Sequence, residues 1–329
     1  MKGLRLTFAN VGYGEAILLE AEAPELNDGI FRMIIDGGSG EAEEFAESTS
    51  GRIPFAEYLK TKEIRHVDVM VNTHIHEDHT CGLLPLSEEL KIDSFWQSLP
   101  VDWYQGTRDL DVSEADTPSA GKYLSSLNDY RKICSNLAQQ GCRIEEVSDG
   151  LTLRVTEDFS VRVIAPSNRE KQLLLDYLNA IYEAENVEAR RLARNRADAA
   201  MNNLSIILMA EYAGKRILLP GDTAGNGYTD VTAELQADIF KVGHHGQKDG
   251  VSKEVFARIQ PDYVICCASS DRRYNSAAPE ILGMMEEMGA EICYSDCPSV
   301  AGFTEHLKPH HALIFEISPS GKIVYRYES

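Results

Sequence analysis

The feature that most constrains this chain is a short segment rich in metal ligands, THIHEDHT at residues 73–80, which directly follows a predicted buried strand. His74 and His76 are two residues apart, so an extended backbone aims both side chains at one point. Asp78 and His79 follow at a predicted turn into a helix, where they can aim at a second point nearby. Imidazole nitrogens and a carboxylate suit zinc, manganese or iron. The segment therefore predicts a metal centre at the end of a strand.

The hydrophobic pattern around this segment predicts an α/β chain in which strands and helices alternate. Predicted strands cover residues 4–8, 15–20, 31–35, 67–72, 151–155, 161–164, 204–210, 216–219, 238–242, 263–267, 312–317 and 322–327. Predicted helices cover residues 41–62, 125–140, 169–201 and 279–288. Residues 103–121 are polar and loop-like. The charged helices between 101 and 200 are interpreted as a solvated face, with a cap over a site as the alternative.

Charge and cysteine content exclude several classes of protein. The 32 Lys and Arg against 52 Asp and Glu give a net charge of −20, which argues against a role in coating duplex DNA. No apolar run approaches the ~20 residues of a membrane helix, and the N-terminal residues lack the apolar core of a signal peptide. The seven Cys include no C-x-x-C pair and are predicted to be reduced thiols, which indicates a cytoplasmic protein.

The segment His74-x-His76-x-Asp78-His79 resembles the signature of the metallo-β-lactamase superfamily. Further motifs, in the right order, resemble its ComEC-like branch, typified by the metal-dependent domain of a bacterial DNA-uptake channel. These motifs are GYGEAIL at 12–18, IIDGG at 34–38, NNLS at 202–205, LLPGD at 218–222 and KVGHHG at 241–246. The resemblance implies a four-layer αββα sandwich, and we expect one domain over residues 1–329 with a partly helical insertion around 101–200 that caps the site.

The resemblance also implies which residues hold two divalent ions at one edge of the sheets. His74 and His76 would bind the first ion, Asp78 and His79 the second, and the carboxylate of Asp222 would bridge both. His245 is the preferred further ligand of the second ion, with His244 as a substrate contact or proton donor, although the sequence does not separate the two. Asp36 would support the ligand loop from behind, and the two glycines after it would let the backbone pass close by. Zinc is the expected metal and manganese the alternative.

Two departures from the family pattern affect the site. No histidine lies between His79 and His244, where many members place a middle ligand, so the first ion lacks one protein ligand. Asn202 or Asn203, a water or the substrate would fill this position, or only one ion would bind. Three late histidines, His306, His310 and His311, are expected on an exposed loop and strand. Cys81 stands where relatives usually carry Gly, and packing under the loop is preferred over an oxidation-sensitive role.

These observations predict a metal-dependent hydrolase that acts through a metal-bound hydroxide. The preferred activity is that of a phosphodiesterase or nuclease on a nucleic acid or small phosphodiester, with Asp78, Asp222 and His244 in catalytic roles and His244 or Lys241 stabilising the leaving oxygen. The alternatives are a small-ester hydrolase, acting on a phosphocholine ester or lactone, and a non-catalytic metal-binding partner protein. Pocket shape separates the first two, since a small ester favours a narrow apolar pocket and a polymer favours an open trough.

Overall fold

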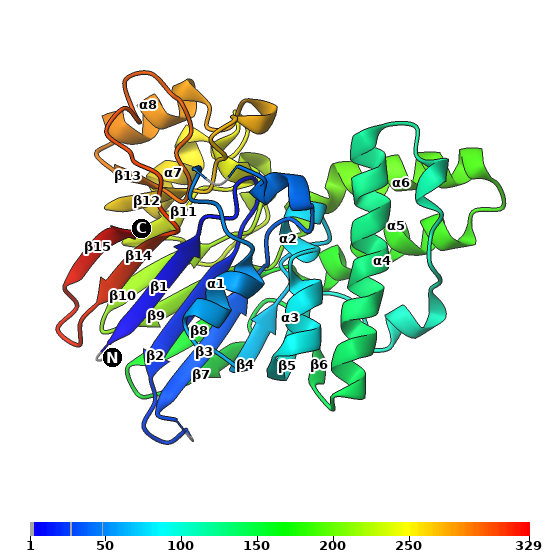
Figure 1. Cartoon of the computed structure of the whole chain (residues 1–329), viewed down its shortest axis with the longest axis horizontal. Helices are drawn as coiled ribbons and strands as arrows, with labels where there is room; N and C mark the ends of the chain where they lie inside the picture. The colour runs from blue at the N-terminus through cyan, green and yellow to red at the C-terminus, as the bar shows by residue number, and fades with distance from the viewer. Residues whose placement is uncertain (1–2, 27, 48) are drawn as a thin grey trace.

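The computed structural model describes residues 3–26, 28–47 and 49–329, which form two mixed sheets packed face to face (Figure 1). The first sheet has the order β15 (Ile323–Glu328), β14 (Ala312–Ile317), β1 (Leu4–Ala9), β2 (Ile17–Glu22), β3 (Ile30–Ile35), β4 (His66–Val71), β5 (Lys91–Gln97) and β6 (Arg143–Glu146). The second has the order β13 (Glu291–Tyr294), β12 (Tyr263–Cys266), β11 (Ile239–Lys241), β10 (Lys215–Leu219), β9 (Ile207–Tyr212), β8 (Phe159–Ala165) and β7 (Thr152–Arg154).

Each sheet combines an antiparallel half with a parallel half. The pairs from β15 through β3 are antiparallel, whereas β3, β4, β5 and β6 run parallel. In the second sheet, β7 to β10 are antiparallel and β10 to β13 are parallel. Parallel strands end at the same edge of a sheet, and this edge is where open α/β sheets hold their ligands.

The helices are α1 (Phe55–Thr61), α2 (Glu77–Thr80), α3 (Leu83–Glu89), α4 (Pro118–Gln139), α5 (Asn168–Glu183), α6 (Val187–Met201), α7 (Lys253–Ile259) and α8 (Pro279–Glu287). One core cluster lies between the sheets, and it joins side chains such as Phe8 of β1 to side chains such as Leu208 of β9. A second cluster packs α1, α3 and α4 on the outer face of the first sheet. A third packs α7 and α8 on the second sheet. These layers confirm the predicted αββα sandwich.

Helix boundaries differ from the predictions where capping residues decide them. The predicted helix over 41–62 is instead a short 3-10 turn at Ala42–Phe45 followed by α1, because Pro54 starts a new helix. Helix α4 begins at Pro118, seven residues before the predicted start, because the Thr117 side chain accepts from the amide of Ala120.

The predicted helix over 169–201 is two helices, α5 and α6. The break falls before Asn186, whose side chain caps the amide of Ala189 at the start of α6. Strand β6 joins the first sheet and β7 and β8 join the second, as predicted for residues 144–166. Helices α4, α5 and α6 lie beside the β5–β6 end of the first sheet (Figure 1), and their buried faces join the core cluster that contains α1 and α3. In the described part of the chain, no helix is long and apolar enough to cross a bilayer.

Candidate metal centre

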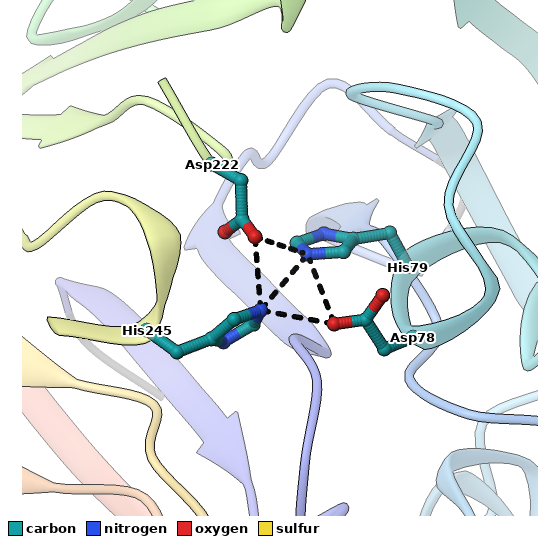
Figure 2. A group of neighbouring side chains, drawn as sticks. All are labelled: Asp78, His79, Asp222 and His245. Carbon is teal, nitrogen blue, oxygen red and sulfur yellow. Dashed lines mark hydrogen bonds and ion pairs between the residues drawn. The ribbon is translucent and has the colours of Figure 1, made fainter. Parts of the chain in front are cut away.

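Four buried side chains from three loops converge at the edge where the parallel strands end (Figure 2). Asp78 and His79 lie on α2, directly after β4, and Asp222 and His245 follow β10 and β11. The Nε2 atom of His245 is 3.0 Å from Oδ2 of Asp78 and 3.0 Å from Oδ2 of Asp222. The Nε2 atom of His79 lies 3.3 Å from Oδ2 of Asp222 and 3.3 Å from Nε2 of His245. Two nitrogens and two oxygens thus face a common point, a donor set that suits a divalent transition metal.

The outward-facing nitrogens of both histidines in this cluster have acceptors. Nδ1 of His79 lies 2.7 Å from Oδ2 of Asp36, and Nδ1 of His245 lies 2.9 Å from the carbonyl oxygen of Cys267. Each ring can therefore donate from Nδ1 and turn its Nε2 toward the cluster, as metal-binding histidines do. Asp36 also accepts from the backbone amide of Thr73 at 2.8 Å, so it stands behind the ligand loop where the sequence placed it.

His74 and His76 form a pair beside the four-residue cluster. Nε2 of His74 is 3.1 Å from Nδ1 of His76, and the rings of His74 and His79 have centroids 4.2 Å apart. Among the described residues, no third His, Cys, Asp or Glu brings a ligand atom near both of these nitrogens. The pair therefore offers two imidazole nitrogens to an ion.

The two candidate asparagines for the missing ligand of the first ion differ in their contacts. The Asn203 amide is engaged, because its Oδ1 accepts from the amide of Ala224 at 3.0 Å and its Nδ2 donates to Asn226 at 3.2 Å. Oδ1 of Asn202 is buried and has no partner within the described residues. Asn202 also lines the cleft, so it is the asparagine with a carbonyl oxygen available to a ligand.

Electrostatics keep the carboxylates of the cluster ionised. Burial opposes ionisation, but His245, Lys241 and His79 hold the pKa of Asp222 well below its usual value. Burial likewise disfavours a charged His79, yet the carboxylates of Asp222, Asp36 and Asp78 raise its pKa well above the ordinary value. Burial lowers the pKa of His74 well below normal, with further lowering from the neighbouring histidines. The centre therefore combines ionised carboxylates with a neutral imidazole, an arrangement that a cation would stabilise.

Lys241 lies beneath the cluster and is fully buried. Its Nζ is 3.0 Å from Oδ1 of Asp222 and 2.8 Å from the carbonyl oxygen of Gly221, and it also contacts the buried carboxylate of Glu15. The predicted contact of Lys241 with a leaving oxygen is therefore wrong, because this side chain does not reach the cleft. Sequence reasoning gave no role to Glu15, although its place in the GYGEAIL motif was a signal.

The adjacent histidines after β11 separate in the structure. His245 lies in the cluster, whereas His244 is outside it, with Nδ1 2.9 Å from Oδ1 of Asp249. The two residues have φ values of 47° and 51°, a left-handed backbone that costs energy in residues other than glycine and is concentrated at functional sites. This turn directs His245 inward and leaves His244 on the wall of the cleft.

A cleft of about 550 Å³ opens above the cluster. Its lining comes from the strand-end loops, from α4 and α6, and from the loop after β12. The lining residues are Tyr13, His76, Glu77, Asp78, Ser119, Lys122, Tyr123, Asn195, Asp198, Ala199, Asn202, Asn203, Asp222, Ala224, Asn226, His244, Gln247, Asp249, Arg273 and Tyr274. A second groove of about 620 Å³ shares Gln247, Asp249 and Tyr274 with it. Both are partly open to solvent rather than closed.

Comparison with known proteins gives the family of this fold and site. The model of the family described as "Metallo-beta-lactamase superfamily" matches residues 28–126, which contain Asp36 and the whole 73–80 segment. Together with the αββα fold and the buried His/Asp cluster, this match identifies a metal-dependent hydrolase of the metallo-β-lactamase fold.

The relatives and similar structures of this chain are distant. ComE operon protein 3 of Bacillus subtilis (strain 168) is 22% identical over 275 residues, which are 80% of this chain and 29% of the relative. The chain thus spans less than a third of the length of that protein. Zn(2+)-bound PqqB from Methylobacterium extorquens has a TM-score of 0.44 and 11% identity over 89% of this chain and 98% of that one. A diphosphatase from the PhnP family has a TM-score of 0.40 and 11% identity over 95% and 98%.

Close contact between two loops explains the glycines beside the ligand segment. A Cβ atom on Gly82 would lie 1.9 Å from the carbonyl oxygen of Gly37, and one on Gly37 would lie 2.4 Å from the backbone of Gly82. The loop after Asp36 and the loop after α2 therefore touch through their backbones. This close approach of the backbone agrees with the prediction for the glycines that follow Asp36, whereas Gly82 was not singled out from the sequence.

The remaining histidines and Cys81 lie outside the cluster. His306 and His311 are exposed, as predicted, but His310 is buried, with Nδ1 2.8 Å from the carbonyl oxygen of Lys308. Its expected exposure is wrong because the loop before β14 folds its ring against Tyr327. Cys81 is buried beside Gly40, and burial raises the pKa of its thiol, so packing accounts for it.

Proposed function

We propose that this protein is a metal-dependent phosphodiesterase that acts on a nucleic acid strand or a small phosphodiester. The observation that supports the proposal is the open, polar cleft above the metal centre. Among the described residues that line it, only Ala199 and Ala224 have aliphatic side chains. A lactone or another small ester with an apolar group favours a narrow, apolar pocket, which this cleft does not resemble.

Charge explains why an anionic substrate would depend on the metal ions. Five carboxylates line the cleft, at Glu77, Asp78, Asp198, Asp222 and Asp249, against the cations Lys122 and Arg273. Both cations are already paired, Lys122 with Glu41 and Arg273 with Glu44 at 2.7 Å. Divalent ions would dominate the local field and reverse its sign at the cluster. The same balance supports the expectation that the protein does not coat duplex DNA.

The clustering of Asp78, His79, Asp222 and His245 supports the proposed ligands. His74 and His76 would hold one ion and Asp78, His79 and His245 the other, with Asp222 shared between them as the family resemblance implies; zinc is the proposed metal and manganese the alternative. When bound, such ions polarise phosphate oxygens and lower the pKa of a bound water to near neutrality. His244 is proposed to donate a proton to the leaving oxygen, since Asp249 accepts from its Nδ1 and leaves Nε2 for the substrate.

The chain is proposed to act as a single domain in which α4 and α6 build one wall of the site. Ser119, Lys122 and Tyr123 of α4 and Asn195 and Asp198 of α6 all line the cleft. The helices around 101–200 would then cap the centre, rather than serve only as a solvated face.

The test is hydrolysis of bis-p-nitrophenyl phosphate, compared with p-nitrophenyl acetate and a lactone, by protein loaded with zinc or manganese. Metal content is measured on the same samples by elemental analysis. We expect about two ions per chain and turnover of the phosphodiester. Asp222→Ala should lose the bound metal and the turnover, whereas the control Asp230→Ala, at an exposed position, should keep them. Turnover of the esters without turnover of the phosphodiester would contradict the proposal.

A second variant tests the role of His244. Because p-nitrophenolate leaves without help from an acid, His244→Ala should slow hydrolysis of a dinucleotide by about 10²-fold or more and affect bis-p-nitrophenyl phosphate much less. Its metal content should equal that of the wild type. Equal slowing of both substrates would assign His244 to binding rather than to proton donation.

A further inference from the structure

We propose that Asp198, on α6, is a positioning residue of the first metal site, which holds His76 so that its Nδ1 faces the ion. The proposal rests on the proposed metal-binding role of His74 and His76. It makes the helical insertion a structural part of the metal centre, in addition to a wall of the cleft. Neither the sequence motifs nor the family match, which ends at residue 126, assigns a role to Asp198.

The two nitrogens of His76 have different neighbours. Nδ1 faces Nε2 of His74 at 3.1 Å, and Nε2 lies 3.1 Å from Oδ1 of Asp198. Two nitrogens that bind one tetrahedral zinc at its usual bond length lie about 3.3 Å apart, so the His74–His76 separation fits a shared ion. A carboxylate at Nε2 accepts the ring proton there and leaves the lone pair on Nδ1. Asp198 therefore stabilises the tautomer that can bind a metal.

The other candidate ligand histidines are held in the same way. His79 donates to Asp36 and His245 to a backbone carbonyl, while Nδ1 of His74 lies 3.1 Å from Oγ1 of Thr73. All of these partners belong to the sandwich or to its strand-end loops. Asp198 completes the pattern for His76, but it comes from α6, a helix of the insertion and not a strand-end loop.

Both helices of the cleft wall contact His76. The ring of Tyr123, on α4, packs against it edge to face, with centroids 5.6 Å apart and an interplanar angle of 73°. Tyr123 is buried, and this packing limits rotation of the imidazole. On α6, Ala197 and Met201 are buried against the rest of the protein, which places Asp198 at the border of the buried face, directed toward the cleft.

The charge of Asp198 supports a positioning role. Its carboxylate adds negative charge to a cleft proposed to bind phosphate, where it would weaken substrate binding unless it served another purpose. Its side chain is 36% exposed and its hydrogen-bond partner is His76. Orientation of a metal ligand is a purpose that requires an acceptor at this position.

The test uses zinc alone as the probe, with affinities measured by competition against a chromophoric chelator and stoichiometry by elemental analysis. Loss of such an outer carboxylate typically weakens metal binding 10- to 100-fold. We expect Asp198→Ala to weaken one of two zinc ions by about that factor and to leave the other unchanged. Asp198→Asn retains an acceptor oxygen and should lose less. The control is Asp176→Ala on α5, whose carboxylate accepts from Gln172 of the same helix.

A double variant shows whether the effect passes through His76. If Asp198 acts on this ring, Asp198→Ala should cause no further loss of zinc in a His76→Ala background. An undiminished loss in that background, or a wild-type affinity in Asp198→Ala, would overturn the proposal. Because zinc binding is read without substrate, a failure of phosphodiester hydrolysis would count against the proposed function alone.

Discussion

Replacement of Lys241 by methionine tests whether the buried lysine compensates the charge of Glu15 beneath the metal centre. Lys241 is fully buried and contacts two carboxylates, those of Glu15 and Asp222. Asp222 retains His79 and His245 as partners if the lysine is removed. Glu15 has no comparable alternative, since burial raises its pKa and Lys241 provides the largest opposing effect. The cost of Lys241→Met therefore falls mainly on Glu15.

The cost follows from the protonation of this carboxyl group. With Lys241 absent, the cheapest response of the folded protein is to bind a proton on Glu15. For a carboxyl with an unfolded pKa of about 4.3, this costs about 4 kcal/mol at pH 7.5, at about 1.36 kcal/mol per pH unit. The value agrees with the roughly 3–5 kcal/mol measured when one partner of a buried ion pair is removed. At pH 5.5 the same reasoning gives about 2 kcal/mol.

The assay is urea unfolding in excess chelator at both pH values. The folded pKa of Glu15 in the variant lies above its unfolded value, so the variant approaches wild-type stability near pH 4.3 and loses stability relative to it as pH rises. Adding Glu15→Gln should recover most of the loss at pH 7.5, and Lys60→Met, at an exposed ion pair, should change the stability little at either pH. A deficit under about 1 kcal/mol at pH 7.5, or one independent of pH, would refute the reasoning.

Three further changes have defined outcomes. Asp36→Ala should weaken zinc binding about 10- to 100-fold, seen by chelator competition, because Nδ1 of His79 loses its acceptor at 2.7 Å. Gly82→Ala should lower the unfolding midpoint or prevent soluble expression, since the new Cβ would meet a backbone oxygen at 1.9 Å, whereas Gly106→Ala, with open space around it, should change little. Burial, and then Asp296, raise the pKa of the Cys297 thiol to about 11. Its alkylation rate should therefore keep rising between pH 8.5 and 10, where an ordinary thiol levels off, and a plateau near pH 9 would contradict this.

Much of the fold could be predicted from local patterns. Alternating and apolar runs indicated the strands. The apolar residues of α8 recur at helical spacing and indicated a helix packed on a sheet, because burial of one face leaves a period in the sequence. Boundaries were less predictable where single side-chain contacts decide them. The start of α4 depends on Thr117 and the break before α6 on Asn186, and each cap contributes only about 1 kcal/mol.

The same distinction between local and long-range contacts applies to the residues of the site. Spacing within residues 73–80 was enough to indicate paired metal ligands, since two residues on an extended backbone project to one side. It gave no means to find Asp198, which lies more than a hundred residues away on a surface helix with ordinary charge. Lys241 was the alternative to His244 for stabilising the leaving oxygen, and its burial under Asp222 became visible only once β11 was packed between its neighbours.

The sequence by itself determined the class of chemistry, because clustered histidines and aspartates at a strand end have few uses other than metal binding, and their order along the chain matches one superfamily. Tertiary structure decided which nitrogen of each histidine faces the centre and which of His244 and His245 enters the cluster. It also decided which residues hydrogen-bond to the ligands and hold them in place. The physical reason is the distance along the chain over which each property is set. Side-chain identity and local spacing are written in the chain, whereas hydrogen-bond partners and burial arise from segments brought together by the two sheets.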